Sequence, residues 1–287
     1  MQRLSVQLLF HLFLETMKQN KNLEISAKKA VEGDKVALNA LLENIQHYIY
    51  NICIKILFHP DNAKDATQEI LIKIVTHLSS FNFESHFSTW TYRIATNYLL
   101  NLLDKQKRQQ MNFDIFAKDL AEGHNHYYNA NNAEKKLLVE EVKIGCSTGM
   151  LQCLDTESRI TYVVGEILEF NSTEGAYIQD ITPDTFRKRL SRAREKINEF
   201  TKQNCGLVNP QNNCRCHKKV DDAIIKNRIN PNNLLFASKE LITSIAEVET
   251  ATGLIQSNPN YEYPKQRLNE IKKILEIKLN PNNIREN

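Results

Sequence analysis

The chain has 287 residues, of which 41% are hydrophobic and 25% are charged, as is ordinary for a soluble folded protein with two or three small domains or one large one. Its net charge of only +3 is too small to indicate nucleic-acid binding by itself. Evidence for such a role has to come from the positions of the charges along the chain. The six cysteines are too few and too unevenly spaced for a secreted disulfide framework. We therefore expect reduced thiols and a cytoplasmic protein.

The N-terminal residues include an apolar segment, Leu4–Leu14, that hints at a targeting signal. With 11 residues it is too short to span a bilayer, and no small-residue cleavage site precedes the polar run Lys18–Asn22. We interpret residues 1–22 as an N-terminal extension, with Met17 as an alternative start. No membrane segment is expected.

Apolar residues recur at helical spacing between residues 23 and 108, which predicts one helical domain there. Short breaks at His59-Pro60 and Ser79–Glu84 divide the pattern into three helices. The members of the three stripes are Leu38, Leu41, Leu42, Ile45, Ile49, Ile52 and Ile56; Ala66, Ile70, Ile74 and Leu78; and Phe87, Trp90, Ile94, Tyr98 and Leu102.

The periodicity is lost over residues 109–132, which predicts a flexible linker, and returns over residues 133–202, with breaks near Ser147–Gly149 and Asn171–Thr173. Residues 203–287 begin with a cysteine-bearing turn and continue as a helical extension. Its predicted apolar stripe is Leu234, Leu235, Leu241, Ile245, Val248 and Ile255. The predicted fold class is all-α, with two small helical domains joined by the linker.

A helix-turn-helix is predicted between Ser172 and Lys196. A short helix, Thr173–Ile178, precedes a turn at Gln179–Ile181 and a strong helix start at Thr182-Pro183-Asp184. Thr is a good N-cap, Pro needs no N–H at the first helical position, and Asp complements the positive end of the helix dipole. The core side of the second helix is predicted to consist of Phe186, Leu190, Ala193 and Ile197.

The same helix carries many cations. The residues left to project outward are Arg187, Lys188, Arg189, Ser191, Arg192 and Arg194. A helix of this kind suits a DNA major groove between phosphate walls. The alternative is a solvated basic face on an ordinary surface helix. The capped start, the preceding short helix and the core stripe together favour DNA binding.

Two further segments suggest binding surfaces. Phe81–Tyr98 is rich in aromatic residues and is followed by cations, and such a platform stacks unpaired bases at about 1–3 kcal/mol per contact. The alternative is that Phe81, Phe87, Trp90 and Tyr98 belong to the protein core, and for Phe87 and Trp90 this is what we expect. Asp61–Lys73 presents a polar, partly acidic helix face that suits a partner helix, although alone it would be an unremarkable solvated face.

The chain resembles bacterial RNA polymerase sigma factors of the extracytoplasmic-function (ECF) group in three ordered blocks: Asp61–Lys73, Phe81–Asn97 and Phe186–Arg194. The resemblance covers about residues 23–108 and 133–200. It implies a protein without catalytic activity that directs promoter recognition, promoter melting and transcription initiation. The implied partners are core RNA polymerase and promoter DNA, with an anti-sigma factor as a further candidate.

The resemblance also implies roles for individual residues. Docking on the coiled coil of the polymerase's largest subunit is assigned to Asp65, Gln68, Glu69 and Lys73. Contact with the −10 element is assigned to the loop Asn82, Phe83, Glu84, Ser85 and His86, with Trp90, Arg93 and Asn97 on the helix behind it. Contact with the −35 element is assigned to Thr185, Arg187, Lys188, Arg189, Ser191 and Arg192.

The cysteines form a separate motif, since Gly145–Leu151 and Cys205–Cys216 resemble an ECF subgroup with a cysteine motif and a C-terminal extension. A zinc site could draw on Cys205, Cys214, Cys216 and His217. The spacing departs from a standard finger because it contains no C-x₂-C pair and because Cys216 and His217 are adjacent. If a metal binds, three thiolates with a fourth ligand from elsewhere fit better than the full set of four. The spacing favours the alternative, a tight turn at Asn209-Pro210 whose cysteines pack the extension onto the second domain, so no cofactor is expected.

Two other functions compete with the sigma-factor interpretation. A free-standing helix-turn-helix regulator would need a dimer interface, and nothing in residues 23–108 looks like one. A metal- or redox-sensing DNA-binding protein would make the cysteines the main feature. Co-purification with core polymerase separates the first interpretation from these two.

Overall fold

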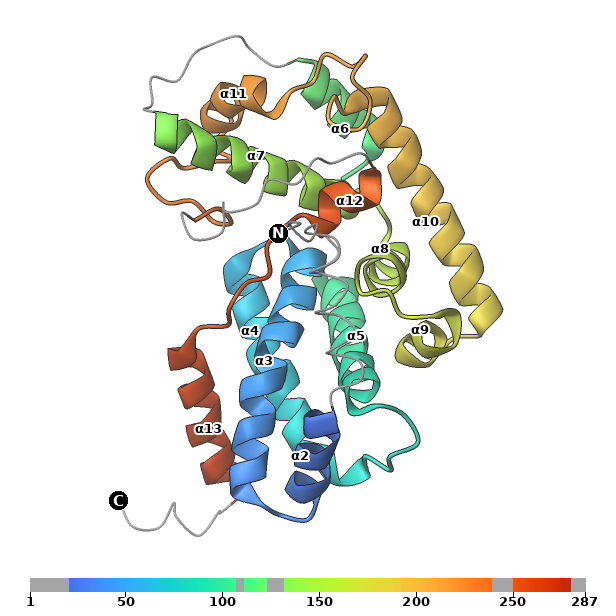
Figure 1. Ribbon diagram of the computed structural model, residues 1–287, viewed down its shortest axis with the longest axis vertical. Coiled ribbons are helices and arrows are strands. Elements are labelled where there is room, and N and C mark those ends of the chain that lie inside the picture. The colour runs from blue at the N-terminus through green and yellow to red at the C-terminus, as the bar shows by residue number, and fades with distance from the viewer. Residues whose placement is uncertain (1–20, 107–110, 123–131, 239–249, 280–287) are drawn as a thin grey trace, which may run out of the picture. The chain divides into compact units, whose positions relative to one another are not determined.

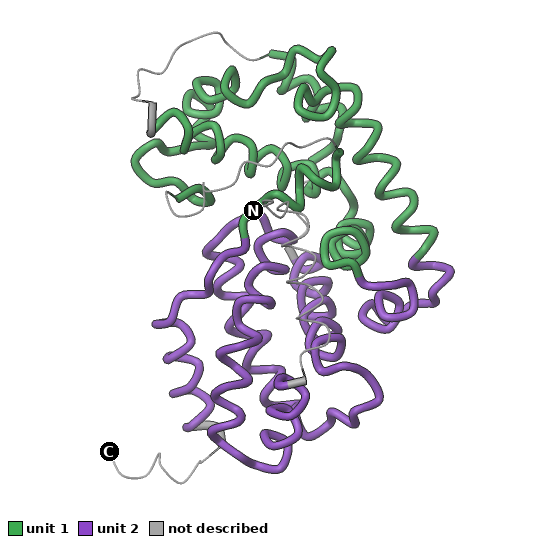
Figure 2. The backbone as a smooth tube through the Cα atoms, viewed as in Figure 1, with its two compact units in different colours: residues 1–12, 108–169, 187–259 green, residues 13–107, 170–186, 260–287 purple. Residues whose placement is uncertain are grey.

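The structure is a computed structural model that describes residues 21–106, 111–122, 132–238 and 250–279. These residues form helices and no strand, which confirms the all-α prediction (Figure 1). Two compact units divide the chain, and each consists of several separate segments (Figure 2). The apolar N-terminal segment Leu4–Leu14 lies outside the described residues, and no described helix is long and apolar enough to cross a membrane.

Unit 2 (purple in Figure 2) takes its described residues from 21–106, 170–186 and 260–279. Its first helices are α2 (Lys21–Val31), α3 (Lys35–Leu57), α4 (Pro60–Thr76), the short 3-10 helix η1 (Leu78–Ser80) and α5 (Phe87–Gln106). The Asp34 carboxylate caps α3 by accepting the N–H groups of Val36 and Ala37 at 2.8 and 3.0 Å. The predicted break at His59-Pro60 falls at the junction of α3 and α4, with Pro60 as the first residue of α4, and the break at Ser79–Glu84 lies between α4 and α5, beginning inside η1.

Most members of the predicted stripes form the core of these helices, whereas Leu38, Ile94, Tyr98 and Leu102 are only half-buried. Along α3 the stripe from Leu41 to Ile56 is at most 1% exposed, and Ala66, Ile70 and Ile74 of α4 are at most 2% exposed. Phe87 and Trp90 of α5 are buried too, which confirms the core alternative for both. At about 25 cal/mol per Å² of apolar surface, this burial is what stabilises the helices.

Unit 2 also contains two helices from later in the chain, α9 (Ser172–Gln179) and α13 (Lys265–Leu279). Helix α9 packs against α5, and α13 packs against α3 and α4. The structure therefore divides the predicted extension, residues 203–287, so that its last described part folds with α3 and α4.

Unit 1 (green in Figure 2) contains α6 (Phe113–Ala121), α7 (Asn132–Gln152), α8 (Thr156–Tyr162) with the π-helical turn η2 (Val163–Ile167), and most of α10 (Pro183–Asn204). The predicted flexible linker was wrong over residues 113–121, because α6 forms there with Asn112 as its N-cap. The Phe116 ring of α6 stacks on Phe200 with centroids 5.4 Å apart. The predicted break near Ser147–Gly149 was also wrong, since α7 continues through it.

The extension in unit 1 includes η3 (Cys216–Lys219), α11 (Val220–Ile225) and α12 (Ala251–Gln256). The predicted helical stripe was wrong at Leu234 and Leu235, because no helix covers that stretch. The buried Glu141 carboxylate instead accepts the backbone N–H groups of Leu235, Phe236 and Ala237 at 2.8, 3.0 and 2.6 Å. Leu241, Ile245 and Val248 lie outside the described residues, and Ile255 is buried on α12.

Candidate functional site

The helix-turn-helix forms where the sequence predicts it. Helix α9 begins after a capping box in which Asn171 accepts the N–H of Glu174 and Glu174 accepts the N–H of Asn171. Asp180 ends α9 in the left-handed region at φ 56°. The Thr182 hydroxyl then accepts the N–H of Thr185 at 3.2 Å, which confirms the predicted start of α10.

The second helix of the motif separates apolar and basic residues. Phe186, Leu190, Ala193 and Ile197 are buried as predicted, with Phe200 continuing the stripe. Two of the cations that were predicted to project outward form ion pairs within unit 1 instead. Arg189 is half-buried in an ion pair with Glu157 at 2.5 Å, and Arg194 pairs with Glu166. The exposed residues of the first turns are Thr185, Arg187, Lys188, Ser191 and Arg192.

The loop before α5 presents an aromatic ring to solvent. Phe83 is 47% exposed, adopts φ 61°, and lies on the buried Phe81 with ring centroids 4.6 Å apart. Glu24 of α2 fixes the end of the loop, because its carboxylate accepts the Phe87 N–H at 2.7 Å and lies 3.6 Å from the His86 imidazole. The loop residues Asn82, Glu84 and His86 are exposed, and Ser85 is half-buried.

Helix α5 places the other three residues assigned to the −10 element in three different settings. Trp90 is 8% exposed and belongs to the core, whereas Asn97 is exposed. Arg93 is held within unit 2 by an ion pair with Asp180 at 2.8 Å and lies 4.7 Å above the Tyr177 ring centre. Sequence reasoning missed the contacts of Arg93, since its partners lie more than 80 residues away in the chain.

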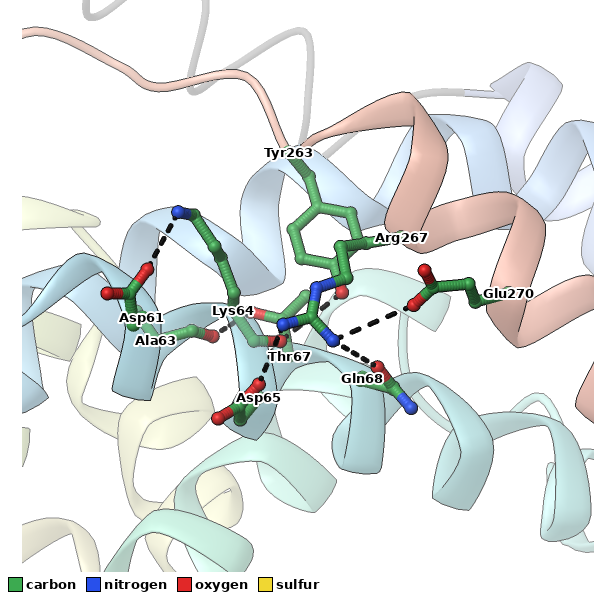
Figure 3. A network of polar contacts seen from close by, with 9 residues as sticks. All are labelled: Asp61, Ala63, Lys64, Asp65, Thr67, Gln68, Tyr263, Arg267 and Glu270. Carbon is green, nitrogen blue, oxygen red and sulfur yellow. Dashed lines mark hydrogen bonds and ion pairs between the residues drawn. The ribbon is translucent and has the colours of Figure 1, made fainter.

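The four residues assigned to polymerase docking lie along one side of α4, at spacings that bring them onto adjacent turns. Glu69 and Lys73 are exposed. Asp65 and Gln68 instead meet Arg267 of α13, which reaches them at 3.3 and 3.5 Å (Figure 3). The predicted face is therefore present, and half of it already has a partner from the same chain.

The cysteine motif closes on one small cavity of unit 1. Cys205, Cys214 and Cys216 line this cavity, of about 20 Å³, together with Cys146 of α7. Burial raises the pKa of Cys216 to about 12 and raises the pKa of Cys146 and Cys214 as well. His217 is not among the lining residues, and as the described side chains stand, no group of three or more His, Cys, Asp or Glu could hold a metal ion.

Together these features are those of an all-α protein with a helix-turn-helix, whose second helix has an exposed basic face, and with an exposed aromatic loop in unit 2. Residues 41–109 match the family model of Sigma-70 region 2. The RNA polymerase sigma-H factor of Pseudomonas aeruginosa is 28% identical over 186 residues, which are 64% of this chain and 94% of that protein.

Two further relatives are ECF RNA polymerase sigma-E factors. That of Haemophilus influenzae is 32% identical, covering 59% of this chain and 90% of the relative. That of Escherichia coli K12 is 30% identical, covering 61% of this chain and 91% of the relative. The chain belongs to the ECF family of RNA polymerase sigma factors.

Proposed function

We propose that this chain is a promoter-specificity subunit that binds core RNA polymerase, recognises a promoter and helps to open it. The observation that carries the proposal is the region 2 match, because residues 41–109 contain both the polar face of α4 and the aromatic loop before α5. In this role the protein is regulatory rather than catalytic and works in the cytoplasm, and the polymerase supplies the chemistry of RNA synthesis.

The −35 element is bound by the first turns of α10. Lys188 and Arg192 are four residues apart and so lie on one exposed face of the helix, with Ser191 beside them. Arg187 adds a further cation near the phosphates. Phosphate contacts fix the register on the duplex, and base-edge contacts in the major groove provide the specificity.

The −10 element is bound by the loop from Asn82 to His86. An extruded base of the non-template strand stacks on the exposed ring of Phe83, and Phe81 supports that ring from below. Asn82 and Glu84 supply polar groups at the rim of this site. These contacts offset an unstacking cost of about a few kcal/mol and so favour the open DNA.

Core polymerase is bound by the polar face of α4, where Glu69 and Lys73 are exposed. The test is reconstitution of the full chain with core polymerase and run-off transcription on genomic DNA. Gln68→Ala with Glu69→Lys should weaken core binding at least several-fold, because the variant can no longer form polar pairs at a partly desolvated interface.

The matched control changes the same residue types elsewhere in unit 2, with Asn39→Ala and Glu32→Lys, both at exposed positions. This control should bind core polymerase as the wild type does. Wild-type binding by the Gln68/Glu69 variant, or no polymerase-dependent transcripts from the unmodified chain, would contradict the proposed function.

A further inference from the structure

The C-terminal segment of unit 2 is anchored on α3 and α4 by apolar side chains. Tyr263 is 1% exposed, and its ring meets that of Tyr50 edge-on with centroids 5.4 Å apart. Along α13, Leu268, Ile271 and Leu275 are 4%, 0% and 3% exposed. Their spacing of three and four residues gives α13 one apolar face, and that face is covered by the helices it packs on.

Hydrogen bonds fix the register of this segment. The Asn51 side-chain amide donates to the Tyr261 carbonyl at 2.8 Å and accepts the Tyr261 N–H at 2.8 Å. The Tyr263 N–H donates to Nδ1 of His47 at 2.8 Å. The Tyr263 hydroxyl donates to the Lys64 carbonyl at 3.2 Å, so the chain is held directly beside α4 (Figure 3). A specific docked position results, because paired polar groups tolerate no shift along the chain.

In this register Arg267 contacts Asp65 and Gln68, two of the residues assigned to docking on core polymerase. The Arg267 guanidinium lies 3.3 Å from the Asp65 carboxylate and 3.5 Å from the Gln68 amide oxygen, while Glu270 of α13 lies 3.6 Å from it on the other side (Figure 3). A cation from this chain therefore occupies the acceptors that a docking partner would use.

The edge of this contact is much weaker than its centre. The Arg267 and Asp65 side chains are 40% and 69% exposed, so water and salt screen the ion pair between them. The apolar residues Leu268, Ile271 and Leu275 of α13, by contrast, are buried. A binding partner can therefore compete with Arg267 for Asp65 and Gln68. The buried apolar face keeps α13 docked on α3 and α4 until such a partner displaces the helix.

We propose that α13 is an intramolecular competitor that covers the Asp65–Gln68 part of the polymerase-docking face and lowers the affinity of the free protein for core polymerase. This inference rests on the proposed function of that face. Polymerase binds the fraction of molecules in which Arg267 has released α4, and the apparent Kd rises in inverse proportion to that fraction.

The test compares two charge reversals on the same helix in the full-length chain. Arg267→Glu replaces the ion pair with Asp65 of α4 by like-charge repulsion, which should release the helix and tighten core binding by about 3- to 10-fold. Lys273→Glu changes the same charge at an exposed position of α13 and should leave the affinity unchanged. Fluorescence anisotropy titration with purified core polymerase measures both, and circular dichroism confirms that each variant is folded.

Hydrogen exchange gives a second measurement that needs no substitution. On binding of core polymerase to the wild-type chain, amides of residues 265–276 should exchange faster, because the helix has left its site. Unchanged or weaker binding by Arg267→Glu, or equal or greater protection of α13 in the complex, would overturn the inference.

Failure of the proposed function looks different from failure of the inference. Adding Gln68→Ala and Glu69→Lys to the Arg267→Glu chain should remove the additional affinity. If that combination still binds core polymerase as tightly as Arg267→Glu alone, docking does not use this face, and both proposals are wrong. If it binds less tightly but Arg267→Glu binds no better than the wild type, only the inference is wrong.

Discussion

The ring of Phe186 occupies the space beside the Cα of Gly175 where any other residue would carry its Cβ. A Cβ at Gly175 would meet the Cζ and Cε2 atoms of Phe186 at 2.3 and 2.4 Å, far inside van der Waals contact. Phe186 is 1% exposed and stands in the first turn of α10, four residues after the Thr182 cap. The glycine therefore permits the close approach on which the helix-turn-helix depends.

Gly175→Ala should destabilise the protein by about 1–3 kcal/mol, because a rigid buried ring has to shift to admit the methyl group. Promoter binding should fall with it, since Phe186 leads into the basic face of α10. Urea unfolding and a −35 duplex titration measure the two effects. Gly145→Ala is the control, since a Cβ there meets nothing within 4 Å and a helical alanine is favoured over glycine by about 1 kcal/mol. Equal tolerance of both changes would contradict the packing role of Gly175.

Charge reversal on the exposed face of α10 should abolish −35 recognition and leave the fold intact. Lys188→Glu and Arg192→Glu each act on a solvent-exposed side chain, so the buried stripe is untouched. If the lost cation contacts a DNA phosphate, the slope of the logarithm of the binding constant against the logarithm of the salt concentration should become less steep by about 0.9. Lys202→Glu is the control, ten residues beyond Arg192 and so about 15 Å further along the helix. Normal promoter-dependent transcription by the Lys188 or Arg192 variants would show that another helix reads the −35 element.

The loop before α5 should act after DNA is bound. Asn82→Ala with Glu84→Ala removes two exposed polar groups beside the Phe83 ring, so closed-complex binding should persist while open-complex formation falls. Permanganate footprinting of −10 thymines measures the opening. Ser79→Ala, at an exposed position just before the loop, should leave the footprint unchanged. Undiminished thymine reactivity in the double variant would remove the loop from the melting step.

Local patterns predicted most of the helices and the helix-turn-helix, because caps and stripes are set by residues within one or two turns. Three adjacent side chains, Thr182-Pro183-Asp184, mark the start of α10, and Phe186, Leu190 and Ala193 mark its buried side. Helix α6 was predictable as well, since Asn112 is a good N-cap and Phe113 and Phe116 stand at helical spacing. The linker prediction failed there because a short helix is marked by its N-cap and not by a long apolar stripe.

Contacts between distant segments left no comparable pattern in the sequence. Glu141 accepts three N–H groups from residues 94 to 96 positions away, and Arg267 meets Asp65 across 202 positions. Each of these side chains resembles an ordinary surface charge until the fold brings its partner near. Cys146 of α7, which lines the cysteine cavity, was linked to the later cysteines by the family resemblance and not by any local pattern.

Zinc binding by the cysteine motif would require the thiols of the small cavity to move together, since as they stand they form no metal-holding group, and it would give about one metal ion per chain purified without chelator. The fourth ligand should then be Cys146 rather than His217, because Cys146 lines the same cavity as Cys205, Cys214 and Cys216. Elemental analysis of Cys214→Ser/Cys216→Ser and of Cys146→Ser should show no bound metal, while His217→Ala retains it. Cys53→Ala, in unit 2, is the control. Less than about one-tenth of a metal ion per wild-type chain would contradict zinc and leave the four thiols as packing groups.

Lys55, in the last turn of α3, should make stability depend on pH. Its side chain is buried, and desolvation lowers its pKa to about 8 from the usual 10.5. Between these values the unfolded chain holds a proton that the folded chain has released, so this lysine makes stability rise with pH, by up to about 1.4 kcal/mol per unit. Lys55→Met should be more stable than the wild type by about 3 kcal/mol at pH 7, and the difference should shrink between pH 8 and 10.

Urea unfolding over that range measures the difference in stability, and comparing the two chains cancels the titrations that they share. Lys35→Met, at an exposed position of α3, should show a small difference that does not vary with pH. A constant difference for Lys55→Met would mean that the ammonium group keeps its proton in the folded protein.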